Sequence, residues 1–308
     1  MKTAFLFNGQ GAQFAGMGKD FYQAYPQIRG LFDDAAIDFD LKEVCFSDNP
    51  EKLNNTAYTQ SCIAAVSSAI ASLLREKGIQ ADYAAGLSLG EYSALAFAGV
   101  IHPQDLLQLV RKRGLIMAQA LPEGTTGMAA VLRPDVKAVK EVCAKVEMEG
   151  ECCRIANYNS PRQVVITGTN AGLEKAAALL KEKKMPCKFL TVSGAFHSPL
   201  LKEASDQLEE VLAPLEFHAP SCPVVFNVTA RMEHDDIKQL LKKQICSPVL
   251  FWQSIETLAD EGVDTFVEIG PGKTLGKLVK QIVPEAVVYS VSSVQDLEDL
   301  VKEFENGK

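Results

Sequence analysis

The feature that most constrains the fold of this chain is a Gly-x-Ser-x-Gly pentapeptide, Gly86 to Gly90, between a short apolar run and an Ala-rich amphipathic segment. This order predicts a strand, a sharp turn and a helix, because the two glycines allow a tight turn and a close approach of strand and helix. Ser88 would then stand at the helix N-terminus, where backbone amides and the helix dipole favour developing negative charge. Ser88 and Glu91 also have the spacing of a capping box. The pattern therefore predicts either a nucleophilic serine or a helix cap.

Length and charge limit what such a serine does. The chain has 308 residues, of which 47% are hydrophobic, enough for one large domain and a smaller one with its own core. Its formal net charge of -8 argues against nucleic acid or an anionic membrane surface as the main partner. The long uncharged segment from Thr56 to Leu74 contains several hydroxyl and amide side chains, so it indicates a buried helix rather than a membrane span.

The cysteines and the N-terminal segment indicate the compartment. The eight cysteines form no C-x-x-C pair and have no histidine at zinc-ligand spacing, so we expect no metal site and no disulfide framework. They are typical of reduced thiols, and the first apolar run is too short for a secretory signal. We therefore expect a cytoplasmic protein with no permanently bound metal or cofactor.

The hydrophobic pattern changes from Met128 onward. It predicts strand 128–133, helix 135–147, strand 152–157, strand 163–168, helix 171–184 and strand 187–192. This β-α-β-β-α-β order is that of a ferredoxin-like fold. We therefore predict a ferredoxin-like subdomain over residues 127–192, inserted into an α/β catalytic domain formed by residues 1–126 and 193–308.

His197 is the candidate base for Ser88. It follows the last predicted strand of the subdomain and precedes a helix that begins with Ser198 and Pro199. A positive helix end disfavours imidazolium, so the ring would stay neutral and able to accept a proton. The other three histidines are more simply surface or turn residues. No acidic residue between Ser88 and His197 is convincingly placed to orient the ring, so a dyad with a backbone carbonyl as the orienting group is the simpler hypothesis.

Arg113 is unusual because its helical neighbours are all apolar. Those three and four residues away are Leu109, Val110, Ile116 and Met117. A guanidinium on such a face must bind an anion or extend to solvent. Near a nucleophile its planar fork suits a carboxylate, although an internal salt bridge explains the same pattern. The flanking Arg111 and Lys112 have mixed neighbours and are expected to be solvated.

Further short motifs accompany these residues along the chain. The full set is Gly9-Gln10-Gly11-Ala12-Gln13, the turn from Gly86 to Ser93, Arg113-Gly114 with Met117, Asn157 to Pro161, His197, Pro248-Val249 and Glu268 to Gly272. Taken alone, the turn at Gly9 indicates a phosphate loop no better than a plain turn, and the turn at Gly270 is interpreted as structural. In this order and spacing, the motifs resemble those of the malonyl-CoA:acyl carrier protein transacylases, the discrete acyltransferases of bacterial fatty acid synthesis. The resemblance covers essentially the whole chain.

The resemblance implies an α/β-hydrolase-like large domain with a parallel central sheet, together with the inserted ferredoxin-like subdomain. It implies that Ser88 is acylated, and that His197 is its general base and then the general acid for the departing thiol. The backbone amides of Gln10 and Leu89 would form the oxyanion hole. The implied reaction is ping-pong transfer of a malonyl group from malonyl-CoA to the phosphopantetheine thiol of acyl carrier protein, feeding fatty acid synthesis.

The remaining implied roles concern substrate selection and orientation. Arg113 would bind the malonyl carboxylate, and the carbonyl of Leu250 would orient His197. In related polyketide acyltransferases a bulky aromatic residue at the position of Phe196 accompanies malonyl rather than methylmalonyl selection, because it leaves no room for the extra methyl. Leu87 stands where the family commonly has histidine, which removes a polar neighbour of the nucleophile but leaves the dyad intact.

The resemblance also implies acyl carrier protein as the partner, and we expect the enzyme itself to be a monomer. Carrier proteins are usually acidic, so we expect a local basic patch on this acidic chain. The candidates are Lys181, Lys183, Lys184 and Lys188 of the subdomain, or Lys242 and Lys243. A solvated helix face explains the same lysines without any partner.

Three alternatives stay open. A serine hydrolase or thioesterase would share the turn and His197, but it has no need for Arg113 on an apolar face. A non-catalytic docking subunit for a carrier protein would explain the fold without chemistry, although intact Ser88 and His197 argue against it. A polyketide-pathway acyltransferase is a closer variant with the same residues.

Overall fold

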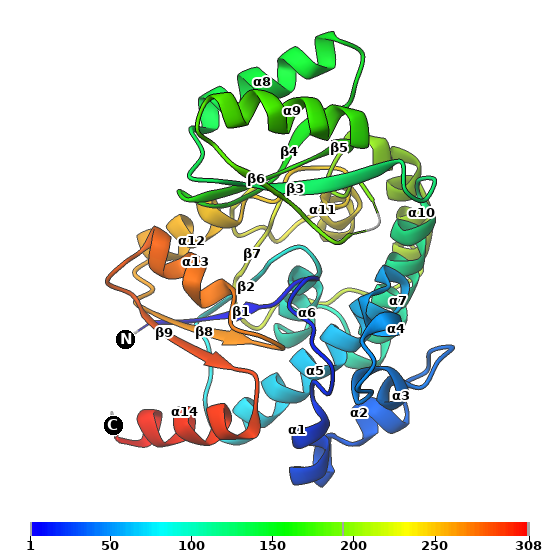
Figure 1. Ribbon diagram of the computed structural model, residues 1–308. Coiled ribbons are helices and arrows are strands. Elements are labelled where there is room, and N and C mark those ends of the chain that lie inside the picture. The colour runs from blue at the N-terminus through cyan, green and yellow to red at the C-terminus, as the bar shows by residue number, and fades with distance from the viewer. Residues whose placement is uncertain (1, 193, 307–308) are drawn as a thin grey trace.

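The computed structural model describes residues 2–192 and 194–306, which contain two β-sheets (Figure 1). The larger sheet has the strand order β7-β2-β1-β8-β9, and its strands pair in parallel. The smaller sheet has the order β4-β5-β3-β6, and its strands pair antiparallel. The prediction of an α/β fold with a parallel central sheet and a separate small subdomain is confirmed.

The strands of the central sheet are parallel, so their carboxyl ends lie at the same edge of the sheet. Its strands are β1 (Thr3–Phe7), β2 (Tyr83–Gly86), β7 (Val224–Val225), β8 (Thr265–Ile269) and β9 (Val287–Val291). Alternate residues of β1 belong to two different core clusters, so both faces of the sheet are covered. Phe7 pairs with Gly86 on one side and with Ile269 on the other, so three strands end at the same edge. Parallel α/β sheets bind their ligands at this edge.

The large domain contains helices that pack on the central sheet or on one another, and one of them forms much of the core. They are α1 (Lys19–Ala24), η1 (Pro26–Ile28), α2 (Gly30–Asp33), α3 (Leu41–Cys45), α4 (Glu51–Asn54), α5 (Thr56–Glu76), α6 (Leu89–Phe97), α7 (Pro103–Gln119), η2 (Pro199–Leu201), α10 (Lys202–Leu212), α11 (Ile237–Gln244), α12 (Phe251–Asp260), α13 (Leu275–Ile282) and α14 (Val294–Asn306). Among the described residues, α5 alone is long and apolar enough to span a membrane by length and composition, and 78% of its most apolar window is buried inside the protein. The predicted buried helix is therefore a core helix, packed mainly against α7.

The smaller sheet and its helices have the predicted β-α-β-β-α-β order. The elements are β3 (Thr126–Leu132), α8 (Val136–Met148), β4 (Cys153–Ser160), β5 (Gln163–Thr169), α9 (Asn170–Glu182) and β6 (Cys187–Phe189). Figure 1 shows α8 and α9 on one face of this sheet, with the other face turned toward the large domain. The last strand ends at Phe189 rather than at residue 192, although the Leu190 N–H still donates to the Met128 carbonyl of β3 at 2.9 Å. Leu190 and Val192 pack against the core of the large domain.

A short stretch of backbone pairing ties the subdomain to the large domain. The Tyr158 N–H donates to the Val249 carbonyl at 2.9 Å, and the Val249 N–H donates to the Ala156 carbonyl at 2.8 Å. Asn157 and Val249 thereby form a parallel bridge between β4 and the segment that leads into α12. This pairing holds β4 of the subdomain against the segment that connects α11 to α12 in the large domain.

Candidate active site

The turn between β2 and α6 is the sharp strand-to-helix turn that the pentapeptide predicts. A Cβ on Gly86 would lie 2.0 Å from the carbonyl carbon of Gly90, and a Cβ on Gly90 would lie 2.0 Å from the Phe7 carbonyl oxygen. Only glycine fits these two close approaches. Ser88 itself has φ 53 and ψ -103, a strained conformation for a residue other than glycine. Its side chain makes no capping hydrogen bond, and the Glu91 carboxylate accepts the Asn227 N–H instead, so the capping-box alternative is wrong.

Ser88 and His197 are in contact. The Ser88 Oγ lies 2.8 Å from His197 Nε2, and His197 is only 4% exposed. His197 Nδ1 lies 2.9 Å from the Gln244 carbonyl oxygen, which only accepts hydrogen bonds, so Nδ1 carries the proton and Nε2 is the free acceptor. Burial, together with the nearby positive charge of Arg113, lowers the pKa of His197 to about 4. The imidazole is therefore neutral near pH 7 and able to take the Ser88 proton.

The carbonyl that orients His197 belongs to Gln244, so the expectation for Leu250 is wrong. The Leu250 carbonyl accepts two hydrogen bonds from Ser254, one from its N–H at 2.9 Å and one from its Oγ at 2.8 Å. Leu250 precedes the first turn of α12, so its carbonyl is used by that helix. Gln244 is the last residue of α11, and the carbonyls of a final turn lack helical partners. Its carbonyl accepts only a long bond from the Ser247 N–H, at 3.4 Å, and its second lone pair binds the histidine.

Arg113 is buried beside the nucleophile and has no carboxylate partner among the described residues. Its guanidinium donates to Gln60 Oε1 at 2.7 Å, to Gln244 Oε1 at 2.9 Å and to Ser88 Oγ at 3.3 Å. It lies 5.0 Å from the centroid of the Tyr92 ring, and its Nε has no partner among the described residues. Burial lowers the pKa of Arg113, which is 1% exposed. A buried cation held only by neutral groups strongly favours an entering anion.

Arg111, two residues earlier on α7, has the ion pair that Arg113 lacks. Its Nε and Nη2 donate to the Asp38 carboxylate at 2.5 and 2.7 Å, and it lies against the rings of Phe39 and Tyr58. Arg111 is only 7% exposed, so the expectation that it is solvated is wrong. The mixed polarity of its helical neighbours gave no indication of Asp38, which reaches it from the loop before α3.

The loop after β1 lies directly against the serine turn. A Cβ on Gly9 would lie 2.3 Å from the Leu87 carbonyl oxygen, and the Leu87 N–H donates to the Phe7 carbonyl at 3.1 Å. In residues 2–192 and 194–306, the backbone N–H groups of Gln10 and Leu89 donate to no protein acceptor. Free amides on either side of a serine are what an oxyanion hole requires.

The two domains together line a cavity of about 140 Å³ around Ser88. The large domain contributes five polar residues, Ser88, His197, Arg113, Gln10 and Gln60, and the subdomain contributes Met128, Asn157, Asn159 and Val165 among others. Phe196 and Leu87 also line it, and the Phe196 side chain is 5% exposed. The cavity therefore brings a nucleophile, a neutral base and a buried cation together.

Three polar side chains at this site were missed by sequence reasoning. Gln60 and Gln244 hold Arg113, and Asn227 accepts the Ser88 N–H at 2.7 Å. Gln60 lies in the uncharged α5 segment, where it was counted only as a polar residue that weakens a membrane interpretation. No periodicity or motif marked the other two.

The chain is an α/β protein of the acyl transferase family, because the sequence model described as acyl transferase domain matches residues 4–303. It is similar to the malonyl CoA-acyl carrier protein transacylase of Bacillus subtilis, at 43% identity over 96% of this chain and 95% of that protein. The solved malonyl CoA-acyl carrier protein transacylase of Clostridium perfringens superposes with a TM-score of 0.95 at 39% identity, covering 99% of this chain and 98% of the other. A further solved structure holds a type II PKS acyl-carrier protein in complex with its malonyl-transacylase. The matched chain of that structure is 35% identical to the present chain and superposes with a TM-score of 0.95. The match covers 98% of the present chain and 100% of the other.

Proposed function

We propose that this protein transfers a malonyl group from malonyl-CoA to the phosphopantetheine thiol of acyl carrier protein by a ping-pong mechanism, and so supplies fatty acid synthesis. The observation that carries the proposal is Arg113, a buried cation that forms no ion pair within residues 2–192 and 194–306. It donates to the hydroxyl of a serine that is paired with a neutral histidine. A substrate that combines a thioester with a free carboxylate fits both features at once. The names of the similar proteins support the same substrate and carrier.

In the first half-reaction, Ser88 Oγ gives its proton to His197 Nε2 and attacks the thioester carbonyl carbon of malonyl-CoA. The resulting oxyanion is stabilised by the N–H groups of Gln10 and Leu89. The tetrahedral intermediate then collapses, the carbon–sulfur bond breaks, and the departing CoA thiolate takes the proton from His197. The products are free CoA and a malonyl ester on Ser88.

In the second half-reaction, the pantetheine thiol of the carrier protein gives its proton to His197 and attacks the ester carbonyl. The same two amides stabilise the second oxyanion, and Ser88 leaves with the proton that His197 returns. Every group in this scheme belongs to one chain or to a substrate, so the proposal includes a monomeric enzyme with no resident metal or cofactor. The eight cysteines are free thiols in the structure, which supports the further proposal of a cytoplasmic enzyme.

Phe196 supports a preference for malonyl over methylmalonyl groups. Its side chain lines the cavity and belongs to the hydrophobic core of the large domain, so the ring has little freedom to move aside. A Cβ on Gly194 would lie 3.0 Å from the Phe196 ring, which shows how closely the backbone packs against it. An added methyl on the acyl chain would have to displace this ring or the neighbouring wall of the cavity.

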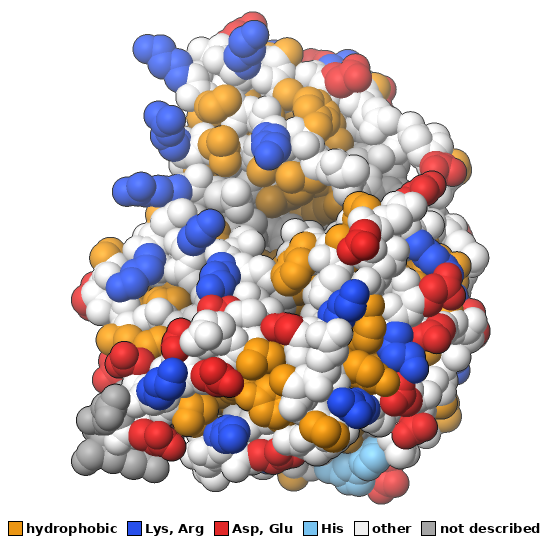
Figure 2. Space-filling view, turned by 60° about the horizontal axis from the view of Figure 1, so that its bottom comes forward, with side chains coloured by type: hydrophobic (Ala, Val, Ile, Leu, Met, Phe, Trp, Pro, Cys, Tyr) orange, Lys and Arg blue, Asp and Glu red, His pale blue; other side chains and the backbone are white. Residues whose placement is uncertain are grey.

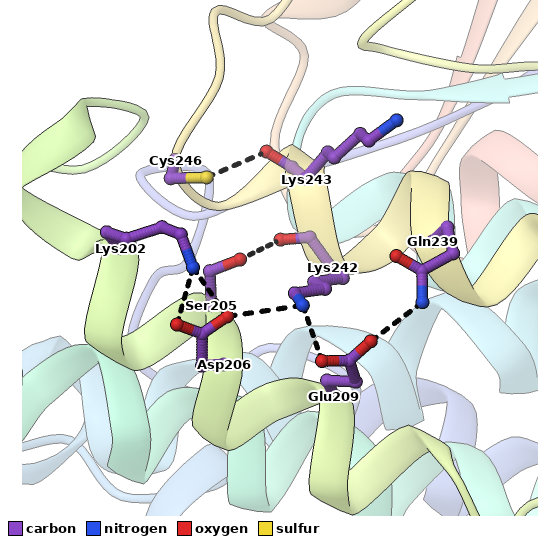
Figure 3. Close-up of polar contacts among 8 residues, drawn as sticks. All are labelled: Lys202, Ser205, Asp206, Glu209, Gln239, Lys242, Lys243 and Cys246. Atoms are coloured by element: carbon purple, nitrogen blue, oxygen red, sulfur yellow. Dashed lines mark hydrogen bonds and ion pairs between the residues drawn. The ribbon is translucent and has the colours of Figure 1, made fainter.

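The positive side chains available to a carrier protein differ between the two predicted sets. Figure 3 shows Lys242 of α11 between Asp206 and Glu209 of α10, with the Asp206 contact at 3.2 Å. Its charge is therefore already paired, while Lys243 beside it is exposed.

The four lysines of the subdomain set are all exposed, and none forms an ion pair with the part of the chain that the structure describes. They are Lys181, Lys183, Lys184 and Lys188. Figure 2 shows Lys and Arg side chains gathered along one edge of the subdomain, beside the hollow between the domains. We propose the subdomain set as the carrier surface.

The experiment that tests the proposal is intact mass spectrometry after brief exposure to malonyl-CoA or acetyl-CoA. We expect a malonyl adduct on the wild-type protein that Ser88→Ala abolishes, and that carrier protein removes by accepting the group. Arg113→Ala should lose the preference for malonyl over acetyl, while Arg154→Ala, an exposed arginine paired with Glu147 on the subdomain, should behave as wild type. No adduct, or an adduct lost to water rather than to carrier protein, would favour the docking-subunit or hydrolase alternative.

A further inference from the structure

The backbone at Ser88 is held by one side-chain amide. The Ser88 N–H donates to Asn227 Oδ1 at 2.7 Å, and Asn227 Nδ2 donates to the Gly86 carbonyl at 2.7 Å. A single planar group therefore fixes both peptide groups on either side of Leu87, just before the strained serine. The backbone pairing of β2 with β7 ends at Ala85, so the Asn227 side chain continues that pairing where the backbone no longer does.

Asn227 is itself fixed from two directions. Its N–H donates to the Glu91 carboxylate, and its carbonyl accepts the Leu250 N–H at 2.8 Å. Asn227 is 1% exposed and Glu91 is fully buried. Burial raises the pKa of Glu91 to about 8, so this carboxyl group occupies an unfavourable environment for its charged form. Glu91 lies on α6 three residues after Ser88, so it links the helix that follows the nucleophile to the residue that holds the turn before it.

The chemistry of the clamp requires an amide. One acceptor faces the Ser88 N–H and one donor faces the Gly86 carbonyl, which a carboxylate or a hydroxyl cannot reproduce together in the same plane. On the other side of the serine, Gln244 Nε2 donates to the Ser88 carbonyl at 2.9 Å. Both backbone polar groups of Ser88 are thus held by side chains from distant segments, which keeps a strained φ of 53 in place.

We propose that Asn227 is a positioning residue for the reaction, which keeps the Ser88 Oγ within reach of His197 Nε2, and that Glu91 fixes Asn227 in the required orientation. This inference rests on the proposed function, in which Ser88 is the nucleophile. Asn227 does not line the cavity and touches no reacting atom. It acts through the backbone of Ser88, since a displacement of about 1 Å at a reacting group costs on the order of 100-fold in rate.

The test is rapid-quench intact mass spectrometry of Asn227→Ala, Asn227→Asp, Glu91→Ala and Glu91→Gln with malonyl-CoA. We expect Asn227→Ala and Glu91→Ala to acylate about 10- to 100-fold more slowly, with KM for malonyl-CoA changed less than about threefold. The fraction of molecules that finally carry the adduct should equal that of wild type. Glu91→Gln keeps a carbonyl acceptor for the Asn227 N–H, so its acylation rate should return to within about threefold of wild type. Asn227→Asp keeps the side-chain volume but loses the donor, so we expect it to acylate as slowly as Asn227→Ala. It replaces Asn227→Ala in the test if the alanine variant does not fold.

Val142→Ala, in the separate core of the subdomain, is the control for a loss of stability alone. It should lower the melting temperature without slowing acylation. The inference is overturned if the Asn227 variants acylate at the wild-type rate, or if they differ only in the fraction of molecules that acylate, as a purely structural role predicts. A wild-type protein that forms no adduct would overturn the proposed function itself, which is a distinct result.

Discussion

The two domains of this protein differ in charge as well as in sheet topology. Residues 127–192 contain eleven basic and seven acidic side chains, a net charge of +4, whereas the rest of the chain has twenty basic and thirty-two acidic side chains, a net charge of -12. The large domain holds Ser88, His197 and Arg113 around the carboxyl ends of parallel strands, and the subdomain adds apolar and amide groups to the cavity wall. We infer that the large domain performs the chemistry, while the subdomain shapes the cavity and attracts an acidic partner. Substitutions in each domain should therefore affect different steps.

The largest effect should come from Ser88→Ala in the large domain. Loss of the nucleophile removes the acyl-enzyme pathway, so we expect the rate of malonyl transfer to fall by about 10⁴- to 10⁶-fold. The measurement is transfer from malonyl-CoA to carrier protein, followed by mass. Ser72→Ala, at an exposed position of α5, is the matched control and should retain full activity. Substantial residual transfer by Ser88→Ala would place the acyl group elsewhere.

Arg113→Ala should have the next largest effect, and only on substrates with a carboxylate. Removing the buried cation leaves the malonyl carboxylate unpaired, so we expect kcat/KM for malonyl-CoA to fall by about 10²- to 10³-fold. The value for acetyl-CoA should change little or rise, since acetyl has no charge to pair. Equal losses for both substrates would mean that Arg113 acts mainly by supporting the Gln60 and Gln244 side chains.

The pH dependence of stability should report the buried state of His197. Its pKa is about 4 in the folded protein and about 6.5 when unfolded, so the unfolded state binds more protons between these values. The contribution of His197 to the free energy of unfolding is therefore fully present above pH 6.5 and is lost, by about 3 kcal/mol, as the pH decreases toward 4. Glu91, whose pKa burial raises to about 8, contributes with the opposite sign, because its folded form loses stability as the pH rises toward 8. Urea unfolding of wild type and His197→Gln at a series of pH values isolates the His197 contribution, because Glu91 is common to both. The wild-type free energy of unfolding minus that of the variant should fall as the pH decreases from 6.5 toward 4. An unchanged slope in the variant would assign the acid sensitivity to other groups.

Features of both domains that depend on residues close in the sequence could be predicted, whereas contacts between distant residues could not. The strand-turn-helix at Ser88 and the order of elements in the subdomain follow from local patterns, namely glycine spacing and hydrophobic periodicity. The apolar helical neighbours of Arg113 predicted that its guanidinium either binds an anion or extends to solvent, and the structure shows that it is buried. The orienting carbonyl of Gln244 was not predictable, because a backbone acceptor has no side-chain signature. Asn227 was missed because it reaches Ser88 across 139 residues of sequence, a contact that no local pattern encodes.

The ion pair of Arg111 could not be predicted from the sequence for the same physical reason. Its helical neighbours describe the face on which it lies, but its Asp38 partner is 73 residues away along the chain. Arg111 and Arg113 therefore lie close together on one helix but differ in their partners. Arg111 is paired with Asp38, whereas Arg113 is available to an anionic ligand. Periodicity predicts which faces are buried, whereas the identity of the partner depends on tertiary packing.

A smaller effect is expected at Phe196, where the cavity wall selects the acyl group. Phe196→Leu should make room beside the acyl chain and narrow the preference for malonyl-CoA over methylmalonyl-CoA by about tenfold, the size expected for one methyl group in an apolar pocket. The measurement is the ratio of kcat/KM for the two substrates. Phe217→Leu, which is half-buried and does not line this cavity, is the control. A wild-type enzyme that uses both substrates equally would contradict the role given to the ring.

The smallest effect should come from reversing a single charge on the subdomain. Lys188 lies on β6, two residues before Leu190 of the cavity wall, and is exposed. We expect Lys188→Glu to raise KM for carrier protein by about three- to tenfold at low salt, because one exposed charged contact contributes about 1 kcal/mol and is screened by added salt. Acylation by malonyl-CoA should be unchanged, since the first half-reaction involves no carrier. Lys302→Glu, on α14 of the large domain, is the matched reversal and should leave both steps unchanged. If Lys302→Glu weakened the carrier step as much as Lys188→Glu, the effect would reflect net charge, and the contrast between the two domains would not extend to partner binding.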